Sequence, residues 1–146
     1  MADTDEGDFR IVKTDASETV RQVLFEAASE LLDISTDPRQ QIIIAQSMAS
    51  LREDDKLLIE YKTGTATSVD YGTSVVRIPI RRRNVRTGNV AESYLRHSDF
   101  ASADVTVAAG SWIKIGSYTV PAQEEIRIGQ SIAENSRIYV ALIEAA

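Results

Sequence analysis

The chain has 146 residues, of which 43% are apolar, 26% charged and 6% aromatic, as expected for one globular domain. Its apolar content is too high for intrinsic disorder, and no apolar run approaches the ~18 residues of a membrane-spanning helix. Cysteine is absent and histidine occurs once, which excludes disulfides, thiolate metal sites and a cysteine nucleophile. The acidic N-terminus lacks the basic and apolar regions of a secretory signal.

Charge is unevenly distributed along the chain. The first 73 residues carry seven basic and fifteen acidic side chains, a net charge of −8, whereas the remaining 73 carry nine and seven, a net charge of +2. This asymmetry indicates electrostatic contact, either between copies of the chain or with an acidic partner. The overall acidity argues against a general nucleic-acid binder. Six arginines lie close together with only Glu92 opposing them: Arg77, Arg81, Arg82, Arg83, Arg86 and Arg96.

The N-terminal region predicts an extended arm followed by a helix. Residues 1–14 combine an acidic head with an alternating stretch at 9–13 and read as an arm that needs a partner to hold it. Asp15 and Glu18 form a capping box, which predicts a helix over residues 15–33. Apolar residues then follow the spacing of one buried helical face: Val20, Val23, Leu24, Ala27, Ala28, Leu31 and Leu32.

The next segment is open to two interpretations. Asp37 and Pro38 have the form of an N-cap and a first helical residue. The β-branched density of residues 42–46 favours a strand, while later apolar residues keep helical spacing, so periodicity alone leaves 38–51 undecided between helix and strand. We favour the strand.

The rest of the chain has a β pattern. Residues 56–62 predict a strand, and the Thr/Ser-rich stretch 64–72 predicts an exposed connection. Residues 76–81 alternate apolar and polar side chains, and Pro79 within them favours a sheet edge or a bulge. Residues 87–89 signal a turn, and further strands are expected at 104–108, 112–115, 125–128 and 137–142.

These elements predict a mainly β (α+β) protein. Short strands separated by turn residues are typical of an antiparallel β-sandwich or a jelly-roll-like domain. We expect the arm at 1–14 to precede a single domain at 15–146, which includes one or two N-terminal helices.

No motif in the chain indicates catalysis. His97 stands beside Ser98 and Asp99, but adjacency in sequence is not triad geometry, and no nucleophile elbow precedes a serine. Residues 3–8 resemble the start of a calcium loop, yet Glu6 occupies the position of the obligatory glycine. The glycine spacing makes no phosphate loop. We therefore predict no enzyme activity, no cofactor and no metal site.

The arginine cluster is the feature that most indicates a function. Three successive arginines at the end of a strand must point to alternate faces, so at least one has to leave the sheet or pair with an acid. The accompanying apolar residues are aliphatic, and the run has no aromatic platform for single-stranded nucleic acid. Guanidinium groups make bidentate contacts with carboxylates, which favours an acidic protein surface as partner. The predicted partner-binding residues are Phe9, Arg10, Arg81, Arg82, Arg83 and Arg86.

The C-terminal half resembles a pattern of tailed-phage virion proteins. The stretches that carry the resemblance are WIKIGSYTVPA at 112–122, EIRIG at 125–129 and SRIYVAL at 136–142. In those proteins a K-x-G-x-Y-x-V-P-A turn joins two strands and the last strand ends the chain. The resemblance covers residues 50–146, and the pattern often has glycine where this chain has Gln123. The chain is thus similar to the capsid decoration, or cement, proteins of tailed phages.

That resemblance implies a virion structural protein. Members bind the outside of the head as small β-sandwich oligomers and bridge neighbouring major capsid subunits, which implies a homo-oligomer, with a trimer as our expectation. It implies no catalytic residue, no cofactor and neither a nucleic-acid nor a membrane partner. The protein would be made in the host cytoplasm and reside on the capsid surface.

Two other functions remain open from the sequence. One is a tail, neck or head-fibre-base virion protein with the same turn pattern. The other is a carbohydrate-binding or hydrolytic β-sandwich domain that uses Trp112.

Overall fold

The computed structural model describes residues 7–28, 41–44, 49–64, 66–101, 105–128 and 137–144. These residues form two antiparallel β-sheets, with a single short 3₁₀ turn, η2 (His97–Asp99), and no α-helix among them. Within these segments there is accordingly no helix that could cross a membrane. The described part of the chain is mainly antiparallel β.

The first sheet has four strands, and its two central strands are the most buried. In spatial order they are β2 (Arg21–Ala28), β1 (Gly7–Thr14), β5 (Lys56–Thr63) and β9 (Ile113–Thr119). Each neighbouring pair is antiparallel. On β1 and β5 the inward side chains include Phe9 opposite Tyr61 and Ile11 opposite Ile59, and all four are fully buried.

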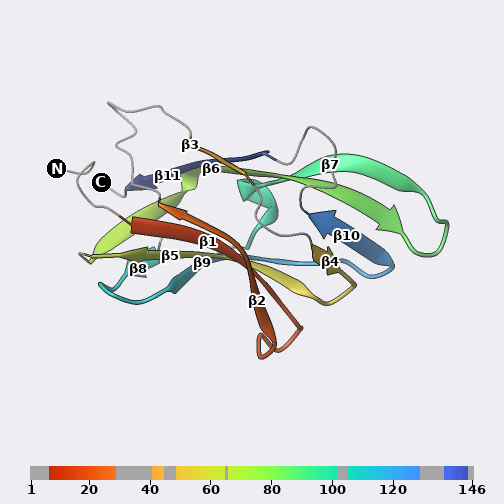
Figure 1. The fold of residues 1–146 in the computed structure, drawn as a ribbon, viewed down its shortest axis with the longest axis horizontal. Helices are drawn as coiled ribbons and strands as arrows, with labels where there is room; N and C mark the ends of the chain where they lie inside the picture. The colour runs from red at the N-terminus through yellow and green to blue at the C-terminus, as the bar shows by residue number, and fades with distance from the viewer. Residues whose placement is uncertain are drawn as a thin grey trace.

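The second sheet has seven strands and is organised around one long strand, β6 (Thr67–Asn84), which spans much of the molecule in Figure 1. The first half of β6 pairs with β11 and β8, and the second half with β10 and β7. The outer members β3 and β4 pair with β11 and β10. The strands joined to β6 directly or through a neighbour are β3 (Gln41–Ile44), β4 (Ala49–Leu51), β7 (Val90–Arg96), β8 (Val105–Val107), β10 (Glu124–Ile128) and β11 (Arg137–Glu144).

Pro79 lies where β6 changes partner. It faces Tyr94 of β7, while on the other side the β11 pairing reaches Arg77 and the β10 pairing begins at Arg81. A proline cannot donate to a β-ladder, so a gap between two partner strands accommodates it. The sequence placed Pro79 at an edge or a bulge, and the structure places it at this gap.

Both sheets contribute to one apolar core. Phe9 and Phe25 of the four-stranded sheet lie with their ring centroids 6.1 Å apart and belong to the same buried cluster as Ile78 and Ile80 of β6. Because each sheet buries only its inner face in this cluster, the arrangement is sandwich-like. The outer faces carry charged side chains together with some buried apolar ones, Val12 and Leu58 on the first sheet and Ala141 and Ile143 on the second.

The predicted helix over residues 15–33 is wrong. Residues 15–20 form a turn and β2 occupies Arg21–Ala28, while 29–33 lie outside the described residues. The register between β1 and β2 shifts at Ile11 and Val12, so Leu24 and Phe25 are both buried although they are consecutive. This bulge breaks the two-residue period by which a strand is predicted. Val20 and Val23, assigned to the buried face of the predicted helix, are exposed.

Residues 7–14 do not form an extended arm. They are β1, hydrogen-bonded on both sides by β2 and β5. A Cβ atom at Gly7 would collide with the Tyr61 ring and the Lys62 carbonyl oxygen, so the first residue of β1 has to be glycine for this close approach. Residues 1–6 lie outside the described part of the chain.

Other predicted elements are confirmed or corrected as follows. Residues 41–44 and 49–51 are strands, which resolves the described part of 38–51 in favour of β structure. The predicted exposed connection at 64–72 is wrong beyond Thr67, because β6 begins there and buries Val69. The strand β7 was not predicted, since most of its side chains are exposed and it has only one buried residue, Leu95.

Candidate functional site

Five arginines share the outer face of the seven-stranded sheet. The inward residues Val76, Ile78 and Ile80 alternate along β6 with outward ones, and strand pairing extends that outward row to β7, β10 and β11. We call this surface the arginine face and define it by nine residues: Arg77, Arg81, Arg83, Glu92, Tyr94, Arg96, Glu125, Arg127 and Tyr139. With five arginines and two glutamates, these residues carry a net charge of +3.

The three successive arginines all pair with acids. On the arginine face Arg81 lies 3.4 Å from Glu92 and Arg83 lies 2.8 Å from Glu125. Arg82 is on the opposite face of the strand and donates to Glu124 over 2.8 Å. The sequence required at least one of the three either to leave the sheet or to pair with an acid, and in the structure all three pair.

Arg82 closes one end of the core. It lies opposite Ile126, beside the buried ring of Tyr118. Burial raises the pKa of the Tyr118 hydroxyl above its ordinary value, against the opposing effect of Arg82. Arg82 is therefore committed to the fold and is removed from the predicted contact residues.

Arg77 has a different environment from the arginines that follow it. Its guanidinium carbon lies 4.4 Å from the ring centroid of Tyr139 and 5.4 Å from that of Tyr94. The guanidinium of Arg96 lies 5.9 Å from the same Tyr94 ring. The Nε atom of Arg77 is buried and has no hydrogen-bond partner within the described residues. Arg77 is thus held by aromatic rings and not by an acid.

The remaining predicted contact residues are dispersed. Phe9 is fully buried in the core, so its side chain is inaccessible to a partner in this fold. Arg10 is on the outer face of the other sheet. Arg86 is exposed in the turn between β6 and β7, at one end of the molecule (Figure 1). That turn is held by Asn84, whose side-chain oxygen accepts the backbone N–H groups of Arg86 and Thr87.

On the outer face of the four-stranded sheet, the charges neutralise each other. Glu60 is only 4% exposed and accepts from Arg10 over 2.7 Å and from Arg21 over 2.5 Å. Arg10 also lies 4.1 Å from the centroid of the Trp112 ring, and Lys62 lies 5.3 Å from it. This indole is half-buried and already engaged by two cations.

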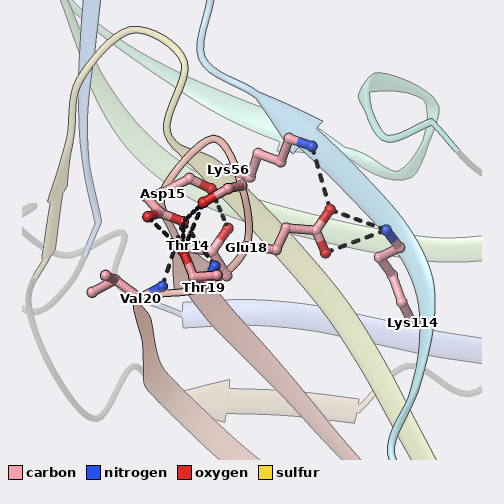
Figure 2. Close-up of polar contacts among 8 residues, drawn as sticks. Thr14, Asp15, Glu18, Thr19, Val20, Lys56 and Lys114 are labelled. Atoms are coloured by element: carbon pink, nitrogen blue, oxygen red, sulfur yellow. Dashed lines mark hydrogen bonds and ion pairs between the residues drawn. The ribbon is translucent and has the colours of Figure 1, made fainter.

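The turn between β1 and β2 folds over that same face, as Figure 2 shows. Glu18 at its tip lies 3.3 Å from both Lys56 of β5 and Lys114 of β9. Glu18 has a left-handed backbone with φ of 61°, a conformation that costs a residue with a side chain about 1–2 kcal/mol. The two ion pairs hold the turn in this position.

Both carboxylates of this turn have lowered pKa values. The Thr19 backbone N–H, 2.9 Å from Asp15 Oδ1, is the largest influence and lowers the pKa of Asp15. Burial alone would raise the pKa of Glu18, but Lys114 and Lys56 outweigh it and lower that pKa overall. The capping role predicted for Asp15 thus serves a hairpin turn and not a helix.

His97, Ser98 and Asp99 are the consecutive residues of the η2 turn. Asp99 Oδ2 accepts the backbone N–H of Arg96 over 2.8 Å and so closes the η2 turn. No group of three or more potential metal ligands occurs in the described segments.

Four residues of the arginine face were missed by the sequence reasoning: Tyr94, Glu125, Arg127 and Tyr139. Tyr94 and Tyr139 are 45 positions apart in the sequence, and only their pairing with the two sides of β6 brings both to Arg77. The alternation of residues 76–81 assigned Arg77 to the polar face, but nothing in it indicated aromatic neighbours.

The comparisons with known proteins found no relatives. No protein-family model matches the chain, and neither the curated proteins nor the solved structures include a match.

Proposed function

We propose that this protein is a virion structural protein that binds the outer surface of a tailed-phage capsid and cements neighbouring major capsid subunits. The sandwich-like fold and the resemblance of residues 50–146 to cement proteins both support this proposal. The arginine face is its capsid-binding surface. The finer fold that we propose is a jelly-roll-like β-sandwich, assembled as a trimer.

The observation that carries the proposal is the charge of the arginine face. The whole chain has a formal charge of −6, while the nine residues of this one sheet face carry +3. Such a concentration of positive charge favours docking onto an acidic surface and disfavours other orientations.

Cementing then follows from mass action. A protein that binds the assembled lattice but not its dispersed subunits stabilises the lattice in proportion to its occupancy. Each contact is repeated at every equivalent position of a capsid, and an oligomer that binds several positions at once gains further through effective concentration.

The geometry favours this function over carbohydrate binding. A sugar platform needs an open aromatic face, whereas the Trp112 ring is half-buried and in contact distance of Arg10 and Lys62. The nearest acid, Glu60, is held by two arginines and so is not poised as a general acid.

The test adds purified protein to expanded phage heads that lack it and measures their resistance to heat and to low salt. We expect heads with bound protein to survive at a higher temperature. The double variant R81Q/R83Q should bind heads more weakly than the matched variant K62Q, which removes a cation from the opposite face. Binding with no gain in resistance would refute cementing.

A map of the intact particle separates the remaining virion alternatives. Density for the chain over the whole shell supports decoration. Density confined to a ring at the neck, tail or fibre base would reject it in favour of those sites.

A further inference from the structure

Arg77 differs from the other arginines of β6 in having no counterion. Arg81, Arg82 and Arg83 each lie within 3.4 Å of a glutamate. Within the described residues, no carboxylate pairs with Arg77, and its Nε atom is buried without an acceptor. Among the described residues, β6 therefore carries three guanidinium groups that pair with glutamates and one, that of Arg77, that pairs with no carboxylate.

An uncompensated cation in a partly buried position is destabilising. The chain keeps it in place with two tyrosines, whose rings lie 4.4 Å and 5.4 Å from the guanidinium carbon. Ring faces attract a cation and also limit its rotamers. The guanidinium is thus ordered before any ligand arrives, which lowers the entropy cost of binding one.

The surroundings of Arg77 would repel a second cation and attract an anion. Arg96 lies directly across on β7 and shares the Tyr94 ring. Of the acids near this row, Glu92 is paired with Arg81 and Asp99 accepts the backbone N–H of Arg96. The Arg77 side chain is half-buried and not closed off. A planar guanidinium in such a place matches a carboxylate through its terminal nitrogens.

We propose that Arg77, clamped between Tyr94 and Tyr139, is the binding site for a carboxylate side chain of an acidic protein partner. The inference rests on the proposed function and deepens it, because it names the residue at the centre of the docking surface and the chemical group that the surface recognises. Arg96 and Arg127 extend the same surface for flanking acids.

Nucleic acid fits this surface less well. Bases bind by stacking on open aromatic rings, whereas both tyrosine rings here are already in cation–π contact with arginine. The net charge of the protein is also negative, and nucleic-acid affinity depends on a basic footprint.

The experiment measures binding of a fluorescein-labelled hexaglutamate peptide at low salt by anisotropy, with the full chain and three variants. R77Q should weaken binding at least tenfold. R77K retains the charge but loses the planar guanidinium, so its affinity for the peptide should lie between those of the natural chain and R77Q. K62Q removes a cation that also lies over an aromatic ring, but on the opposite sheet face, and should bind within twofold of the natural chain. Circular dichroism and thermal unfolding confirm that each variant is folded.

Other results would overturn the proposal. Equal binding by all four proteins, or no binding by the natural chain, would exclude an Arg77 site for carboxylates. If the natural chain bound a fluorescein-labelled oligothymidylate more tightly than the hexaglutamate peptide, and R77Q abolished that binding, Arg77 would belong to a nucleic-acid site and not to a carboxylate site. The peptide assay contains no capsid. If the protein bound the peptide through Arg77 but did not bind phage heads, the carboxylate site would be supported and only the proposed cementing function would be refuted.

Discussion

The outer faces of the two sheets hold similar residues in opposite states. On the four-stranded sheet, Arg10 and Arg21 pair with Glu60, and Lys56 and Lys114 pair with Glu18. Arg10 and Lys62 also lie over the Trp112 ring. On the arginine face, five arginines face two glutamates, and in the described part of the chain the Arg77 guanidinium contacts two tyrosine rings and pairs with no carboxylate. A face whose charges satisfy one another contributes to folding, whereas a face with unpaired charge is suited to an external partner. The comparison is open to experiment at several residues.

The largest expected effect is at Glu60. Its carboxylate is buried and accepts from two arginines, so Glu60→Gln should lower the free energy of unfolding by about 2–3 kcal/mol. The matched change on the arginine face, Glu92→Gln, removes an exposed partner of Arg81 and should cost under about 0.5 kcal/mol. Urea unfolding of both variants measures the difference. Equal losses would show that the two faces do not differ in their contribution to stability.

The second comparison removes one arginine from each face. Arg10→Met leaves Glu60 with one partner fewer and should lower the free energy of unfolding by about 1–2 kcal/mol. Arg77→Met keeps an apolar stem between the two tyrosines and removes a buried nitrogen without an acceptor. It should be neutral within about 1 kcal/mol, or stabilising. The same urea titration tests this, and a larger loss for Arg77→Met than for Arg10→Met would contradict it.

The β1–β2 turn should respond to acid. Asp15 and Glu18 have pKa values lowered in the folded state, so their contribution is complete above the unfolded pKa of about 4 and is lost as the pH falls through the folded values. Amide hydrogen exchange at residues 15–20, corrected for the intrinsic pH dependence, should show weaker protection at pH 3 than at pH 6. Glu18→Gln should weaken protection already at pH 6 and reduce the response to acid. An unchanged response in that variant would remove Glu18 as its cause.

The smallest effect concerns the link between the two sheets. Gln123, in the turn from β9 to β10, has a left-handed backbone with φ of 66°, and glycine stands at the corresponding place in the virion pattern. Gln123→Gly should raise the free energy of unfolding by about 0.5–1 kcal/mol. Asp54→Gly is the control, because aspartate tolerates its φ of 72° better and its gain should be smaller. A loss of stability for Gln123→Gly would show that the turn is not strained.

Local sequence patterns were sufficient for several parts of this fold. The alternation of residues 76–81 identified the two faces of β6, because the side-chain period of a strand is two. The same period required the three successive arginines to point to alternate faces, so that at least one had to leave the sheet or pair with an acid.

Residues 15–33 show where local patterns fail. Asp15 does accept backbone N–H groups, and Leu24 is buried as predicted. Val20 and Val23, which the helical spacing assigned to the buried face, are exposed, while Phe25, outside that spacing, is buried. Pairing with β1, with an extra residue at Leu24, decided that these residues form a strand. Periodicity cannot reveal a bulge, because the shift is fixed by the partner strand and not by the segment itself.

By itself, the sequence determined a chain rich in β structure with an acidic N-terminal half and a cluster of arginines. Only the tertiary structure decided which of those arginines are neutralised. Arg77, Tyr94 and Tyr139 meet because β7 and β11 pair with opposite sides of β6, a contact between strands far apart in the chain. Strand order and register are set by burial of the whole inner face, so the outward neighbours of Arg77 follow from the core and not from its own local sequence.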